Sequence, residues 1–222
     1  MARRQQQRRR RVAVLISGGG SNLQALVDAA AAPDFPAGVV LVLSNDPGAY
    51  GLERAAKAGV PRRAIDHRPY AGDRAAFEAA LDAALREAGA ELVCLAGFMR
   101  VLTPPFVEAW RDRLLNIHPS LLPAFRGLHT HARALAAGVR VHGCTVHLVR
   151  PELDDGPILV QGAAPVLPGD TEATLAARVL GLEHRCYPLA LRLLASGRAR
   201  VEGERVVVAD EAPGERLLSA DG

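Results

Sequence analysis

A chain of 222 residues with 49% hydrophobic and 23% charged residues has the size and composition of one globular domain. No apolar run approaches the roughly 20 residues needed to cross a bilayer. The basic N-terminus also lacks the apolar stretch of a secretory signal, so we expect a cytoplasmic protein without membrane contact. The three cysteines, Cys94, Cys144 and Cys186, lie far apart without metal-ligand spacing and are interpreted as buried free thiols.

The positive charge is concentrated at the N-terminus. The formal net charge is +3, and the first predicted strand is preceded by six arginines: Arg3, Arg4, Arg8, Arg9, Arg10 and Arg11. Subtracting these six leaves −3 for the rest of the chain. No aromatic residue interleaves them and no nucleic-acid module follows. Residues 1–11 are therefore interpreted as a disordered basic tail, and no specific nucleic-acid partner is expected.

The first half of the chain alternates between strand and helix patterns. Short apolar runs typical of buried strands occupy residues 12–17, 39–44, 61–65 and 91–96. Helical patterns occupy residues 21–32, 52–58, 73–88 and 104–110. This alternation predicts a Rossmann-like, doubly wound α/β fold with a mainly parallel sheet.

The second half predicts an antiparallel extension of that sheet. Residues 114–117 are extended, and strands at 141–149 and 157–165 are joined by a turn. Helices are expected at 131–137 and 171–196, the latter with a kink near Pro188, followed by a small hairpin at 199–201 and 205–208. We expect a single domain at 12–209 and a loose C-terminal tail at 210–222.

An amide, an imidazole and a carboxylate stand out as candidate catalytic groups. Asn116 and His118 lie two apart in an extended segment, so their side chains face the same side. Their N–H groups can stabilise the oxyanion that forms when an amine attacks a carbonyl. A carboxylate can orient the imidazole and favour its charged form. Asp154 and Asp155, in the later turn, are rivals for that role.

A glycine loop lies between the first predicted strand and helix. In Gly18-Gly19-Gly20-Ser21-Asn22, the glycines permit close backbone approach, and the helix N-terminus offers N–H groups to a phosphate. The same pattern also suits a simple turn with Ser21 as the helix cap. Position alone leaves both interpretations open. The loop has neither the lysine of a P-loop nor the spacing of a dinucleotide fingerprint.

Four histidines raise the possibility of a metal site: His129, His131, His142 and His147. No carboxylate or cysteine completes a recognisable ligand set around them, so no metal is expected. His147 lies on the strand that leads into the Asp154 turn, and we expect it to face the site.

Taken together, these segments resemble the formyltetrahydrofolate-dependent formyltransferases, and among them the phosphoribosylglycinamide formyltransferase family. The resemblance runs from about Val12 to about Val208. It is carried by Val14–Gln24, Leu95–Arg100, Leu114–Pro123, Gly127–His131, His142–His147 and Glu152–Gln161.

The resemblance implies a formyltransferase fold and a reaction of purine biosynthesis. In that reaction a formyl group passes from 10-formyltetrahydrofolate, a co-substrate, to the amine of glycinamide ribonucleotide through a tetrahedral intermediate. The implied catalytic residues are Asn116, His118 and Asp154, the last chosen over Asp155. The implied ribonucleotide and phosphate-binding residues are Gly19, Gly20, Ser21, Asn22 and Glu183. The implied folate-binding residues are Arg74, Met99, Arg100, Val101, Leu102 and Asn116.

The chain departs from the family pattern at two positions. Many relatives carry Asn where this chain has Gly19, and relatives often carry Lys or Gln where it has Leu180. Leucine cannot donate a hydrogen bond to a phosphate, which leaves open whether this chain keeps a phosphate contact at that position. A monomer and a homodimer are both compatible with the sequence.

Three other functions remain possible. A formyltetrahydrofolate hydrolase would deliver formyl to water with similar residues, but such relatives carry a small N-terminal domain. Formyl transfer to methionyl-tRNA goes with an additional C-terminal domain. A non-catalytic folate- or nucleotide-binding module on the same fold is disfavoured by the intact Asn116, His118 and Asp154.

Overall fold

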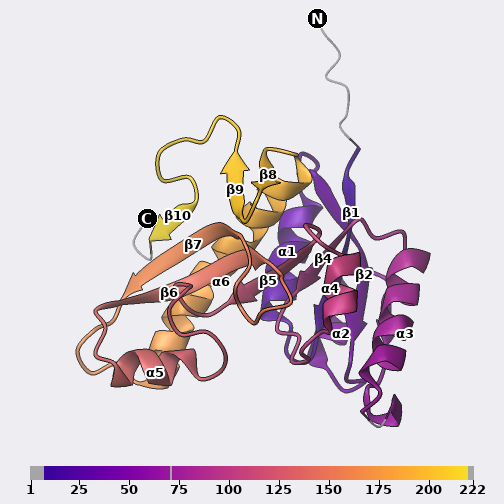
Figure 1. The fold of residues 1–222 in the computed structure, drawn as a ribbon, viewed down its shortest axis with the longest axis horizontal. Coiled ribbons are helices and arrows are strands. Elements are labelled where there is room, and N and C mark those ends of the chain that lie inside the picture. The colour runs from indigo at the N-terminus through magenta and orange to yellow at the C-terminus, as the bar shows by residue number, and fades with distance from the viewer. Residues whose placement is uncertain (1–7, 71, 220–222) are drawn as a thin grey trace, which may run out of the picture.

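The computed structural model describes residues 8–70 and 72–219, which are built around an eight-stranded sheet (Figure 1). Its strands are β1 (Arg10–Ile16), β2 (Ala37–Ser44), β3 (Arg62–Ala64), β4 (Leu92–Leu95), β5 (Leu114–His118), β6 (Val141–Leu148), β7 (Ile158–Pro165) and β10 (Leu217–Ser219). Across the sheet they run in the order β10-β7-β6-β5-β4-β1-β2-β3. A separate antiparallel hairpin joins β8 (Ala199–Glu202) to β9 (Arg205–Val208).

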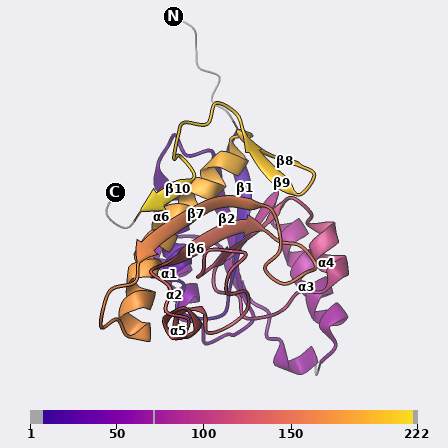
Figure 2. The ribbon, with the colours of Figure 1, turned by 60° about the vertical axis from the view of Figure 1, so that its left-hand side comes forward.

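Helices cover both faces of the sheet (Figure 1, Figure 2). They are α1 (Ser21–Ala31), α2 (Tyr50–Lys57), α3 (Arg74–Glu87), α4 (Pro104–Ala109), α5 (Thr130–Ala136) and α6 (Glu172–Ala195), with a 3₁₀ turn at Arg68–Tyr70. In β1, Val12, Val14 and Ile16 pack with residues of α1 and α6. The alternate residues Ala13 and Leu15 pack with α3 and α4. Burial on both faces explains why β1 reads as a continuous apolar run.

The strand directions confirm the predicted fold class. β1 pairs in parallel with β2 and β4, and β4 pairs in parallel with β5. β6 is antiparallel to β5 and to β7, which forms the predicted extension. The chain leaves β1 toward β2 and returns to its other side at β4, so a topological switch point lies between β1 and β4. The carboxyl ends of strands at such a point form the usual ligand crevice.

The predicted N-terminal boundary at residue 12 differs from the structure. β1 begins at Arg10. Arg8 and Arg10 form ion pairs with Glu91, at N–O distances of 2.7 Å and 2.9 Å. Arg9 donates from Nε to the carbonyl oxygen of Ala37 at 3.0 Å. These arginines are held by partners far along the chain, which composition could not show. Residues 1–7 of the predicted tail lie outside the described residues.

The C-terminal segment also differs from the loose tail predicted at 210–222. β10 adds a parallel edge strand to β7, with Leu217 opposite Gln161. Glu215 pairs with Arg198 at 2.6 Å. The strand spans three residues, too few for a periodic signal, and its partner is far away in sequence. Residues 220–222 lie outside the described part of the chain.

The last long helix keeps its predicted extent. Thr171 and Ser196 are its caps, with a capping box between Thr171 and Thr174. Pro188 lies inside α6, and the helix continues past it to Ala195. Across the described residues, no helix is both long and apolar enough to traverse a membrane.

Candidate active site

The candidate site gathers at the carboxyl edge of the parallel strands. β1 leads into the glycine loop, β4 leads into Ala96–Leu102, and β5 ends at His118. Leu115 and Ile117 of β5 pack on the α1 and α6 face of the sheet. Asn116 and His118 therefore project together to the opposite side, as the spacing predicts. Asn116 is half-buried and His118 is buried.

His118 has an oxygen acceptor beside each ring nitrogen. Its Nε2 lies 3.0 Å from the carbonyl oxygen of Phe125. Its Nδ1 lies 3.4 Å from Oδ2 of Asp154. An imidazolium, which carries an N–H on both nitrogens, satisfies both acceptors at once. Each ring nitrogen of His118 therefore faces an oxygen that can accept its N–H.

His147 contacts both Asn116 and Asp154. The sequence placed it near the site without giving it a role. It lies opposite Asn116 in the β5–β6 ladder. Its Nδ1 donates to the carbonyl oxygen of Leu148 at 3.1 Å, so its Nε2 can accept from Nδ2 of Asn116 at 3.3 Å. Burial lowers the pKa of His147 to about 4, against opposing effects of the Leu148 hydrogen bond and Asp154. A neutral His147 thus fixes the orientation of the Asn116 amide.

The two adjacent aspartates have different surroundings. The Asp154 side chain is 8% exposed and lies near His118 and His147. Its Oδ2 accepts a hydrogen bond from the Gly127 amide at 2.9 Å. Asp155 is 46% exposed and pairs with Arg126 on the surface. Because Asp154 alone faces His118, the geometry supports its selection over Asp155.

Asp154 and Phe125 both occupy the left-handed region, with φ of 51° and 55°. Residues other than glycine are uncommon there, although aspartate tolerates it better than most. Both belong to the loops that surround His118. These loops therefore hold unfavourable backbone conformations where the candidate chemical groups meet.

The glycine loop forms the floor of a cavity of about 400 Å³. The lining residues are Ser17, Gly18, Gly19, Gly20, Ser21, Asn22, Tyr50, Arg54, Ala96, Gly97 and Met99. Gly20 adopts φ of 71°, and a Cβ there would meet the Gly51 backbone at 2.8 Å. Only glycine fits at that position. Gly20 is the N-cap of α1 and Ser21 is the first residue of the helix, so Ser21 does not occupy the cap position.

Glu183 lies behind this loop and is not a solvated surface charge. It is 8% exposed, and its Oε2 accepts from Nδ2 of Asn22 at 2.6 Å. Burial raises the pKa of Glu183, and the Asn22 hydrogen bond partly opposes that shift. Glu183 therefore connects α6 to the start of α1. Leu180, one turn earlier on α6, does not line the cavity over the loop.

The predicted folate-binding residues do not line a single pocket. Arg74, Arg100 and Val101 line a shared recess beside α3. Met99 instead lines the cavity over the glycine loop, and its amide donates to the Ser17 hydroxyl at 2.7 Å. Leu102 is buried in the core between the sheet and α3 and α4. Leu102 thus lies beneath the surface, and Asn116, the sixth predicted residue, lies beside His147.

The remaining candidate groups do not assemble into a second centre. Within residues 8–70 and 72–219, no three His, Cys, Asp or Glu side chains are grouped as metal ligands. Cys94, Cys144 and Cys186 are buried free thiols, as predicted. Burial raises the pKa of the Cys94 thiol to about 12, far from the range of a nucleophile.

Residues 10–191 match the family described as Formyl transferase. The chain therefore belongs to the formyl transferase family. The phosphoribosylglycinamide formyltransferase of Escherichia coli is 45% identical over 181 residues, covering 82% of this chain and 85% of that protein. The predicted resemblance to phosphoribosylglycinamide formyltransferases, and with it the prediction of a formyl-transferring enzyme, is confirmed.

Solved structures support the same assignment. Glycinamide ribonucleotide transformylase 1 from Symbiobacterium toebii superposes with a TM-score of 0.88 at 50% identity, covering 91% of this chain and 95% of that chain. A formyltetrahydrofolate deformylase from Burkholderia mallei shares the fold at 31% identity and a TM-score of 0.82, covering 90% of this chain and 70% of that one.

The trifunctional relatives of this chain are much longer than the chain itself, which spans 13–18% of their length. The trifunctional purine biosynthetic protein adenosine-3 of Gallus gallus is 53% identical over 181 residues, and those residues span 18% of its length. The similarity therefore concerns one segment of that protein.

Proposed function

We propose that this chain transfers the formyl group of 10-formyltetrahydrofolate to the amine of glycinamide ribonucleotide in purine biosynthesis. The observation that carries the proposal is the contact network of Asn116, His118, His147 and Asp154. It supplies hydrogen-bond donors and a carboxylate at the edge of the sheet where ligands bind. The folate is a co-substrate, and the proposed steps use only side chains of this chain.

In the proposed mechanism, the neutral amine attacks the formyl carbon and the carbonyl oxygen becomes an oxyanion. One N–H of the Asn116 amide is held by His147, which leaves the second free to donate to that oxyanion. Charged His118 provides another donor. The attacking amine loses a proton, and the departing folate nitrogen gains one. Asp154 assists this movement and stabilises the imidazolium.

His118 must exchange one partner to act in this way. In the structure its Nε2 faces the Phe125 carbonyl and its Nδ1 faces Asp154. The Asp154 contact maintains the charge, so we infer that the formyl oxygen takes the place of the Phe125 carbonyl. The loop containing Phe125 then moves when substrate binds.

The two substrates occupy neighbouring parts of the crevice in this proposal. The phosphate meets the backbone of Gly19, Gly20, Ser21 and Asn22 at the N-terminus of α1. Glu183 would repel a phosphate, so its role is to hold Asn22 and accept hydrogen bonds from sugar hydroxyls. Folate lies against Met99, Arg100 and Val101, with Arg74 positioned for its carboxylates. Leu102 supports the pocket from the core.

A formyl-transfer assay tests the proposal. Purified chain is mixed with 10-formyltetrahydrofolate in the presence and absence of glycinamide ribonucleotide, and tetrahydrofolate and formylated product are measured. We expect product only with both substrates, and no loss of rate after exhaustive chelation. Hydrolysis of the folate without the ribonucleotide would instead favour the activity named for the deformylase of similar fold. Binding of either substrate without turnover would indicate a non-catalytic module.

A further inference from the structure

The cavity over the glycine loop contains one positively charged side chain. Among the residues that line it, only Arg54 of α2 carries a charge. A phosphate at this loop meets backbone N–H groups and the partial positive charge of α1. A dianionic phosphate group is bound much more strongly when a full charge is also present, which directs attention to Arg54.

Arg54 is held in place above the loop. Its Nε donates to the carbonyl oxygen of Gly19 at 2.8 Å. The guanidinium lies 5.2 Å from the centre of the Tyr50 ring, and Nη1 is 3.5 Å from Oε1 of Gln24. No carboxylate of the described residues forms an ion pair with it. Its charge is therefore positioned but not neutralised, and two N–H groups on Nη2 are available.

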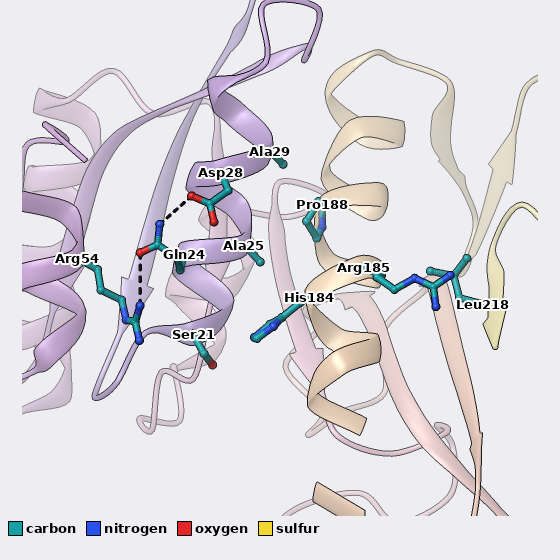
Figure 3. A pocket seen from close by; sticks show the side chains of 10 residues that line it. All are labelled: Ser21, Gln24, Ala25, Asp28, Ala29, Arg54, His184, Arg185, Pro188 and Leu218. Atoms are coloured by element: carbon teal, nitrogen blue, oxygen red, sulfur yellow. Dashed lines mark hydrogen bonds between the residues drawn. The ribbon is translucent and has the colours of Figure 1, made fainter. Parts of the chain in front are cut away.

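A second cavity begins where the first ends. It has a volume of about 750 Å³ between α1 and α6, and both cavities share Ser21 and Arg54. His184 projects from α6 toward Ser21, opposite Arg54 (Figure 3). Its Nε2 is buried without a hydrogen-bond partner in the described structure. Donors from α1, α2 and α6 thus converge beside the glycine loop.

We propose that Arg54 is the cationic residue that binds the substrate phosphate, together with Ser21 and the backbone N–H groups of α1. This inference rests on the proposed function. Arg54 touches the Gly19 carbonyl with one edge of its guanidinium and offers the other edge to phosphate oxygens. It supplies the positive charge that Leu180 cannot provide from α6. His184 borders the same anion from the opposite side.

Steady-state kinetics with matched variants test this assignment. Arg54→Ala is expected to raise KM for glycinamide ribonucleotide by roughly 10- to 100-fold, the usual effect of losing hydrogen bonds to a charged group. KM for the folate and kcat should change less than about threefold. Lys57→Ala is the control, because Lys57 lies 5.7 Å from the same Tyr50 ring but does not line either cavity.

A substrate analogue without the phosphate separates binding from loop support. With glycinamide ribonucleoside, wild-type protein and Arg54→Ala should show equal kcat/KM, because the group that Arg54 binds is absent. If Arg54→Ala lowers kcat/KM for the ribonucleotide and the ribonucleoside by the same factor, Arg54 only supports Gly19. An unchanged KM for the ribonucleotide would also overturn the assignment. Arg54→Gln keeps a donor for Gly19 without the charge, and it carries the test if the alanine variant does not fold. Absence of turnover in the wild type would instead refute the proposed function.

Discussion

Replacing Asp154 with asparagine tests the central electrostatic contact of the site. The carboxylate lies 3.4 Å from His118 Nδ1. At an effective dielectric constant of about 20, opposite unit charges at that separation attract by roughly 5 kcal/mol, which is an upper limit. We expect Asp154→Asn to lower kcat by roughly 10²- to 10³-fold, in the range found when an oxyanion donor is lost. KM for both substrates should change little.

The backbone should tolerate this substitution. Asparagine adopts positive φ readily, and its side-chain oxygen can still accept from the Gly127 amide. Asp155→Asn is the matched control, because it removes an exposed ion pair with Arg126 worth at most about 1 kcal/mol. We would measure kcat against pH for both variants and the wild type. A large loss in Asp155→Asn with near-normal rates in Asp154→Asn would refute this reasoning.

Three further predictions concern catalysis, the N-terminus and acid stability. His118→Ala should lose roughly 10²- to 10³-fold in kcat with an unchanged circular dichroism spectrum; near-normal turnover would remove His118 from the mechanism. Deleting residues 1–7, which leaves Arg8 to Arg11 and their partners intact, should keep kcat/KM within about twofold, and a loss above tenfold would show that the deleted residues act on the substrate. The free energy of unfolding should fall as pH drops from 6.5 toward 4. His147 and His142 have pKa values lowered to about 4 by burial, so the unfolded chain takes up protons first, at a cost of up to about 1.4 kcal/mol per pH unit for each histidine. Urea unfolding at several pH values measures this, and an equally steep decline in His147→Gln would contradict it.

The sequence was sufficient for features encoded by local pattern. The apolar run at β1, the glycine loop and the next helix together predict a βα unit, because burial on both faces demands continuous apolar residues. The two-residue spacing of Asn116 and His118 predicts that they share a side of β5, because side chains alternate along any strand. These inferences needed no knowledge of distant contacts.

Other features depended on partners far along the chain. Local pattern left Asp154 and Asp155 as rivals and only the family resemblance favoured Asp154, because the choice depends on which carboxylate turns toward His118 across the loops. Apart from the family resemblance, nothing in the sequence distinguished Glu183 from other helix charges. In the structure α6 packs against α1 and buries that carboxylate beside Asn22. The ends of the domain were missed for the same reason, since Arg8, Arg10 and β10 are held by Glu91 and β7.

The sequence by itself therefore determined the fold class, the family and the position of the catalytic loop, because repeating patterns and contiguous motifs specify them. Only the tertiary structure decided which groups meet. It paired His147 with Asn116 through strand register, and it brought Arg54 over the glycine loop from a separate helix. Hydrogen bonds and charges act over a few ångströms, so their consequences follow from distances in space and not from separation along the chain.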